Sequence, residues 1–185
     1  GGRGDGRRWS FGGAGIYGFH SKSNDLSEYN RLRPGDAATL YELGEAYALS
    51  GADEQAIVVF SEVIDLAPEI APEALCSRAL AYKQQGEYAK SISDYDKSIQ
   101  LKPDQGTYFK RGMAHSDSED YAKAIKDFSE CIRSYPEQLR YFRERGKAYR
   151  RNGELAQAID DFSRLIEREP KEPSHYDERA KAYKA

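Results

Sequence analysis

A pattern of residues recurs about every 34 positions along the chain, and it constrains the fold more than any other feature. Small residues, aromatic residues and prolines recur in one common register, at successive spacings of 35, 33 and 34 residues. The five columns are Gly44, Ala79, Gly112 and Gly146; Tyr47, Tyr82, His115 and Tyr149; Ala56, Ser91, Ala124 and Ala158; Phe60, Tyr95, Phe128 and Phe162; Pro68, Pro103, Pro136 and Pro170. Several columns in one register indicate an internal repeat, which is typical of stacked repeat architectures.

Each unit of the pattern reads as two helices separated by a turn. In the first unit Leu40, Leu43 and Tyr47 lie at positions i, i+3 and i+7, which is one face of a helix. Residues 50–53 interrupt this spacing, and Pro68 ends the second helix. A small residue lets the paired helices approach closely, and an aromatic residue fills the gap to the next helix. One such unit cannot bury both of its faces, so the units must stack into an all-α solenoid.

This combination of period, small column, aromatic column and proline resembles the tetratricopeptide repeat family. The first unit carries the resemblance in Leu43-Gly44, Tyr47, Ala56, Phe60 and Pro68. The resemblance implies a right-handed superhelical solenoid of helix–turn–helix repeats over residues 37–185. The repeats are expected at about residues 37–70, 72–104, 105–138 and 139–172, with the first helix of a fifth at 173–185.

Residues 1–36 differ in composition and predict a separate, irregular arm. The segment is rich in glycine and arginine, and residues 23–25 would cap a short helix before the first repeat. Its apolar anchors are Trp9, Phe11, Ile16, Tyr17 and Phe19. We expect these anchors to be buried on a partner protein or in the groove of this chain. The partner is favoured, because ordering glycine-rich backbone costs roughly 1–2 kcal/mol per residue.

The resemblance also says where to look for a binding site, because in this family the first helix of each repeat lines a concave groove. The apolar part of the groove is then Tyr41, Cys76, Leu80, Phe109 and Met113, and the basic part is Arg140, Arg143, Lys147 and Arg150. Cys76 is expected on the side of its helix opposite to Leu75 and Ala79, where it would be accessible. The basic residues are expected to form one stripe, either as a solvated helix face or as a site for acidic side chains, a C-terminal carboxylate or a phosphate.

Catalytic and cofactor chemistry is not indicated. The three histidines are widely separated, and no CxxC, HExxH or Walker sequence is present, so we expect no enzyme, cofactor or metal centre. The segment Gly13–Gly18 fits GxGxxG but lacks the flanking strand and helix that a dinucleotide site needs. The two cysteines favour free thiols in a reducing intracellular compartment, such as the cytoplasm or an organelle interior. No apolar run is long enough for a transmembrane segment.

These observations predict a non-catalytic scaffold or adaptor that binds a partner protein as a subunit of a larger assembly. Heat-shock chaperone tails are disfavoured as the partner, because the positions of the family's carboxylate clamp lack its asparagines; they are Tyr41, Glu45, Ser77, Gly106 and Lys110. Two alternatives are retained. One is an RNA-associated protein that uses the arm and the basic stripe over residues 140–151, which the near-balanced net charge of −3 makes less favourable. The other is an assembly chaperone that binds clients transiently.

Two further features are left open by the sequence. Arginine and aspartate recur 16 residues apart at Arg78/Asp94, Arg111/Asp127 and Arg145/Asp161, where the first unit has Leu43 and Val59. Each aspartate pairs either with the arginine of its own unit or with that of the next unit, which would join Asp161 to Arg179. Tyr176 and Tyr183 on the last expected helix should be covered by continuing polypeptide or by another chain.

Overall fold

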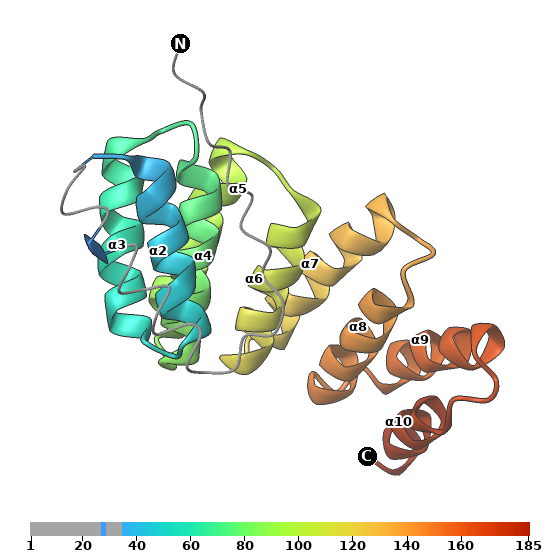
Figure 1. The fold of residues 1–185 in the computed structure, drawn as a ribbon. Coiled ribbons are helices and arrows are strands. Elements are labelled where there is room, and N and C mark those ends of the chain that lie inside the picture. Colours follow the sequence, from blue (N-terminus) through green and yellow to red (C-terminus); the bar gives the residue numbers. More distant parts are fainter. Residues whose placement is uncertain (1–26, 29–34) are drawn as a thin grey trace.

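The computed structural model describes residues 27–28 and 35–185 of the chain. Every regular element in this part is an α-helix, and the helices follow one another with short turns (Figure 1). Their bounds are α2 (Ala37–Leu49), α3 (Asp53–Leu66), α4 (Ala71–Gln84), α5 (Tyr88–Leu101), α6 (Gln105–Asp117), α7 (Tyr121–Ser134), α8 (Leu139–Arg151), α9 (Leu155–Arg168) and α10 (Pro173–Lys184).

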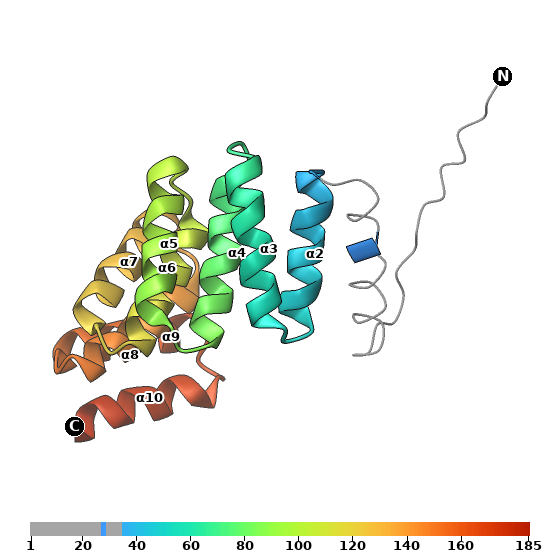
Figure 2. The ribbon, with the colours of Figure 1, turned by 90° about the vertical axis from the view of Figure 1, so that its left-hand side faces the viewer.

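Each helix packs against the next one along the chain, and α2, α4, α6 and α8 also contact one another in that order. We call α2, α4, α6, α8 and α10 the A helices, and α3, α5, α7 and α9 the B helices. Figures 1 and 2 show the pairs as an array that begins with α2 and α3 and has α10 at its other end. The expected all-α solenoid is confirmed.

The small and aromatic columns meet inside each pair of helices. A Cβ atom at Gly44 would lie 2.6 Å from the ring of Phe60, and one at Gly146 would lie 2.9 Å from the ring of Phe162. The same contact recurs at Gly112. Both Phe60 and Phe162 are fully buried. The aromatic ring therefore occupies the space of a missing side chain, which explains why these two columns recur together.

The turn between the two helices of a pair places one residue in the left-handed region. Glycine takes this position at Gly51, Gly86 and Gly153, with φ between 76° and 83°. In the third pair Glu119 takes it instead, with a φ of 64°. The turn keeps its hydrogen bonds, but a residue with a Cβ atom pays roughly 1–2 kcal/mol for this conformation. The missing glycine thus costs local stability and leaves the fold unchanged.

The arginine and aspartate columns form buried ion pairs within each unit. The Nε and Nη2 atoms of Arg145 donate to the two carboxylate oxygens of Asp161 at 2.9 and 2.7 Å. The Asp161 side chain is 7% exposed and the Arg145 side chain 19%. The same two-bonded pairing joins Arg78 to Asp94 and Arg111 to Asp127.

The third nitrogen of each arginine reaches back to the preceding B helix. Nη1 of Arg145 donates to Ser129 at 3.1 Å, and Nη1 of Arg179 donates to Ser163 at 3.0 Å rather than to Asp161. Arg78 and Arg111 make the equivalent bonds to Ser61 and Asp96. The pairing of each aspartate with its own unit is therefore the arrangement that the structure contains, and pairing with the next unit is excluded.

Candidate functional site

Two hollows lie along the A helices. The first, of about 310 Å³, is formed mainly by α2, α4 and α6, and the second, of about 270 Å³, by α6 and α8. The first is lined by Tyr41, Pro72, Glu73, Cys76, Ser77, Ser98, Lys102, Asp104, Thr107 and Lys110. The second is lined by Met113, Ser116, Asp117, Glu119, Tyr121, Glu144, Lys147, Ala148 and Arg151. We call these residues, together with Phe109, Arg140 and Tyr141, the A-helix surface.

The first hollow is polar rather than apolar. The hydroxyl group of Tyr41 lies 3.1 Å from that of Ser77, and the Tyr41 ring packs on Phe60. Burial raises the pKa of Tyr41, so this hydroxyl stays protonated at neutral pH. Lys102 forms an ion pair with Glu73 at 2.7 Å. Tyr41 therefore joins α2 to α4 and is only partly available to a ligand.

Cys76 is not accessible, contrary to the expectation from its helical position. The residue is 8% exposed, and its Sγ atom lies 3.1 Å from Oγ1 of Thr107 and 3.5 Å from Oγ of Ser98. Cys76 packs in one buried cluster with Ala79, Tyr95 and Ala114, so it lies on the same side of α4 as Ala79, and α5 and α6 cover it. The other apolar residue expected on α4, Leu80, is 39% exposed.

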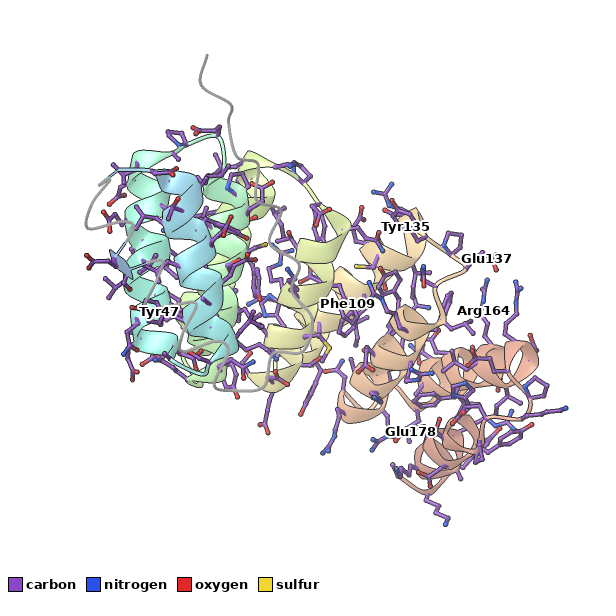
Figure 3. All side chains as sticks on the ribbon, viewed as in Figure 1. Tyr47, Phe109, Tyr135, Glu137, Arg164 and Glu178 are labelled. Atoms are coloured by element: carbon purple, nitrogen blue, oxygen red, sulfur yellow. The ribbon has the colours of Figure 1, made fainter. Side chains whose placement is uncertain are left out.

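An aromatic cluster lies where α6 meets α8. The rings of Phe109 and Tyr141 are 5.3 Å apart, and the guanidinium of Arg140 lies 4.8 Å from each ring centre. Arg140 also donates to the Tyr141 hydroxyl at 2.9 Å, while its side chain remains exposed. Met113 packs against the same apolar cluster as Phe109, the residue that Figure 3 labels on α6. Phe109 thus contacts Arg140 and packs against the same cluster as Met113.

The basic residues of α8 do not form a single stripe. Lys147 lines the second hollow and pairs with Glu144 at 3.0 Å. Arg150 instead pairs at 3.4 Å with Glu178, which Figure 3 labels on α10. Arg143 lines a third hollow, of about 890 Å³, beside the loop from α9 to α10. The basic residues are divided because α8 lies between two other A helices, α6 and α10. The ion pairs of Lys147 and Arg150 reduce the positive charge that is available to an RNA backbone.

Tyr141 is the site residue that sequence analysis missed. It is 2% exposed, and it contacts Phe109, Arg140 and the side-chain amide of Gln105. The signal was a column of otherwise small residues, Thr39, Ala74 and Thr107, in which position 141 is a tyrosine. A large residue at a position that is small in the other units indicates that the neighbouring A helices contact each other differently there than in those units.

His115 and Cys131 are buried in packing positions. Burial lowers the pKa of His115, which occupies the tyrosine column, and raises the pKa of Cys131 to about 12. Within residues 27–28 and 35–185, no three metal-ligating side chains form a group that could hold an ion. None of the described helices is long and apolar enough to cross a membrane. The arm residues Trp9, Phe11, Ile16, Tyr17 and Phe19 lie outside the described residues.

Comparison with solved structures finds the same fold. A tetratricopeptide repeat protein from Parabacteroides merdae ATCC 43184 superposes with a TM-score of 0.79 at 22% identity, over 90% of this chain but only 66% of that one, slightly less than two thirds. MamA from Desulfovibrio magneticus RS-1 gives 0.76 at 22% identity, over 84% of this chain and 88% of that one. YrrB, described as a TPR protein with an unusual peptide-binding site, gives 0.73 at 13% identity, over 87% and 83%.

Comparison with curated proteins gives no match. Profiles described as tetratricopeptide repeat match residues 38–69, 72–105 and 109–173, which together make up most of the chain. These ranges contain the small and aromatic columns of all four complete helix pairs. The profile matches and the solenoid of helix pairs agree, and the chain belongs to the tetratricopeptide repeat family.

Proposed function

We propose that the A-helix surface binds an extended segment of a partner protein that carries an acidic residue beside an apolar one. In this role the chain is a non-catalytic scaffold and a subunit of a larger assembly. The observation that carries the proposal is the exposed guanidinium of Arg140 stacked on Phe109 and Tyr141.

The stacking prepares Arg140 to bind a carboxylate. Two aromatic rings and the bond to the Tyr141 hydroxyl restrict the guanidinium, so less conformational freedom is lost when a ligand binds. In the described part of the chain, no carboxylate forms an ion pair with Arg140. A planar guanidinium held in this way binds a carboxylate through two parallel hydrogen bonds.

Lys110 and Met113 place a second cation and further apolar surface along α6. Lys110 is exposed at the first hollow and has no ion-pair partner among the described residues, whereas Lys102 is neutralised by Glu73. Met113 and Phe109 are half-buried and leave apolar surface on the helix that carries Lys110. An acidic side chain next to an apolar one matches this arrangement. The peptide-binding site described for YrrB supports a peptide ligand on this fold.

The test is selection of peptides from a random displayed library on the 185-residue chain, followed by fluorescence anisotropy with the enriched sequences. We expect enriched peptides to combine aspartate, glutamate or a free C-terminus with a large apolar residue. Arg140→Glu and Lys110→Glu should each weaken binding by about tenfold or more, which corresponds to about 1.4 kcal/mol.

The matched control is Arg133→Glu. Arg133 lies on α7, is 76% exposed and, among the described residues, forms its ion pair with Glu130 of its own helix. This variant should change the affinity by less than about twofold. Enrichment of peptides without acidic groups, or equal losses in Arg133→Glu and Arg140→Glu, would contradict the proposal.

A further inference from the structure

The outer face of α3 carries an exposed apolar side chain at a position where the other B helices are polar. Val58, in the middle of α3, is 67% exposed, and Leu66 at its end is 49% exposed. The residues equivalent to Val58 in the later units are exposed as well, and they are Ser93, Lys126 and Asp160. This face is therefore the solvent side of the B helices inside the array too, and its exposure on α3 does not depend on where the chain begins or ends.

The same face of α3 is acidic. Its exposed residues follow one another at intervals of four and form one row along the helix, Glu54, Val58, Glu62 and Leu66. Neither glutamate of this row forms an ion pair with a described residue. Residues 37–70 contain no lysine or arginine but seven acidic residues, which are Glu42, Glu45, Asp53, Glu54, Glu62, Asp65 and Glu69. The row thus presents acidic and apolar groups in turn, without a cation from its own helix pair.

A row of this kind fits a segment in which basic residues adjoin aromatic ones. The sequence Arg7-Arg8-Trp9-Ser10-Phe11 of this chain has that composition. It belongs to residues 1–22, which contain four basic residues and one acidic residue and so carry a net charge of +3. These residues lie outside the described part of the chain, and their sequence supplies the complement to the α3 row in both charge and apolar character.

This segment is close enough along the chain to reach α3. The hydroxyl group of Ser27 lies 3.0 Å from that of Tyr47, which Figure 3 labels, and α2, the helix of Tyr47, packs against α3. Trp9 precedes Ser27 by 18 positions, and an extended chain of that length spans up to about 60 Å. The 14 residues of α3 are only about 21 Å long. The connection therefore allows contact and keeps the local concentration of the segment high.

Charge favours the outer face of α3 over the groove as the binding site of this segment. The A-helix surface presents Arg140 and Lys110 without ion-pair partners among the described residues, so it would repel Arg7 and Arg8. Contact through residues 7–11 orders five residues instead of the whole glycine-rich arm. The loss of backbone entropy, which disfavours binding of the entire arm, is correspondingly smaller.

We propose that residues 7–11 of this chain bind the outer face of α3. Arg7 and Arg8 pair with the two glutamates of the row. The ring of Trp9 covers Val58, where its large apolar area is removed from water. This surface is separate from the A-helix surface, and the inference does not depend on the function proposed there.

The test is the fluorescence of Trp9, the single tryptophan, in the 185-residue chain and in a synthetic peptide of residues 1–22. Binding should shift the emission of Trp9 in the chain to a shorter wavelength than in the peptide, and it should lower the Stern–Volmer constant for quenching by acrylamide. Raising the salt concentration to about 1 M, where the Debye length is about 3 Å, should move both signals toward those of the peptide.

Two variants locate the binding site on α3. Glu62→Lys and Val58→Ser should each raise the Stern–Volmer constant toward that of the peptide. These changes copy the equivalent residues of α5, Lys97 and Ser93, so neither should impair folding, and circular dichroism checks the helicity. The matched control is Glu167→Lys, the same charge reversal at an exposed position of α9, which should leave both Trp9 signals unchanged.

Three results would overturn the proposal. Emission and quenching equal to those of the peptide would show that the segment is unbound in the isolated chain. Signals that respond to Arg140→Glu but not to Glu62→Lys would place the segment in the groove. A shift in emission that disappears on dilution, together with a dimer in sedimentation equilibrium, would show that the α3 face of a second copy binds the segment.

Discussion

The ion pair of Arg145 and Asp161 makes the sharpest prediction about what holds the repeats together. Replacing Arg145 with leucine removes both hydrogen bonds to Asp161, at 2.9 and 2.7 Å, and leaves a carboxylate that is only 7% exposed. Leucine keeps apolar contact with neighbouring rings, so the loss is mainly that of the stranded charge. Breaking one partner of a buried pair costs about 3–5 kcal/mol, and the partial exposure of Arg145 lowers our expectation to about 3 kcal/mol.

Replacing Asp161 instead of Arg145 should lower the free energy of unfolding by a smaller amount. Asp161→Val strands an arginine whose side chain is 19% exposed and still bonded to Ser129, so water satisfies part of the lost bonding. We expect a loss of about 1–2 kcal/mol. The double variant copies the first repeat, where Leu43 and Val59 are 4% and 9% exposed in one apolar cluster. It should lie within about 1 kcal/mol of the unchanged chain, which corresponds to a coupling of about 3 kcal/mol.

The assay is urea unfolding followed by circular dichroism, because the single tryptophan, Trp9, lies outside the repeats. Burial raises the pKa of Asp161, so the measurement is made at about pH 8, where the carboxylate is ionised. If the two single losses add within about 0.5 kcal/mol, the residues do not interact energetically and the reasoning is refuted.

The other predictions concern one turn, one histidine and the two thiols. Glu119→Gly should raise the free energy of unfolding by about 1 kcal/mol, because φ is 64° at this position; an unchanged urea midpoint would count against it. Burial lowers the pKa of His115, so the unfolded chain binds the proton more readily and stability should fall as the pH drops from about 7 to 5. The tyrosine of the other repeats, introduced as His115→Tyr, should reduce that pH dependence in thermal melts at both pH values, and an identical slope would exclude His115 as its source. Cys76 and Cys131 should react with Ellman's reagent only after unfolding, because they are 8% and 0% exposed; rapid labelling of either thiol in the native chain would be incompatible with the packing described.

The fold was predictable because its signals are local and repeated. Leu40, Leu43 and Tyr47 define a helical face by spacing alone, and the later units repeat the pattern. The partner of Asp161 was not predictable, because Arg145 and Arg179 both lie one helix away along the chain. Only the orientation of the guanidinium, with Nη1 on Ser163, separates the two arrangements.

The candidate site was predictable only in part, because its geometry depends on neighbouring units. Phe109 and Arg140, assigned from the sequence to the apolar and the basic parts of the groove, contact each other because α6 and α8 are adjacent. Cys76 was misplaced because it was put opposite to Ala79, although residues three apart lie on one helix face and both pack in one buried cluster. Helical spacing assigns a residue to one side of its own helix, but it carries no information on which adjacent helix covers that side.

The bond from Nη1 of each of these arginines also bears on how chain length can vary. Every junction between successive pairs uses Nη1 of an arginine and a hydroxyl or carboxylate on the preceding helix. Excision of residues 105–138 would bring Arg145 beside Asp96, the acceptor that Arg111 uses now. The arginine contact would therefore find an acceptor on the other side of the cut, whereas the contacts of Tyr141 with Phe109 and Gln105 would be lost. Duplication or loss of a helix pair would thus keep the arginine contact at each junction while changing the length of the array.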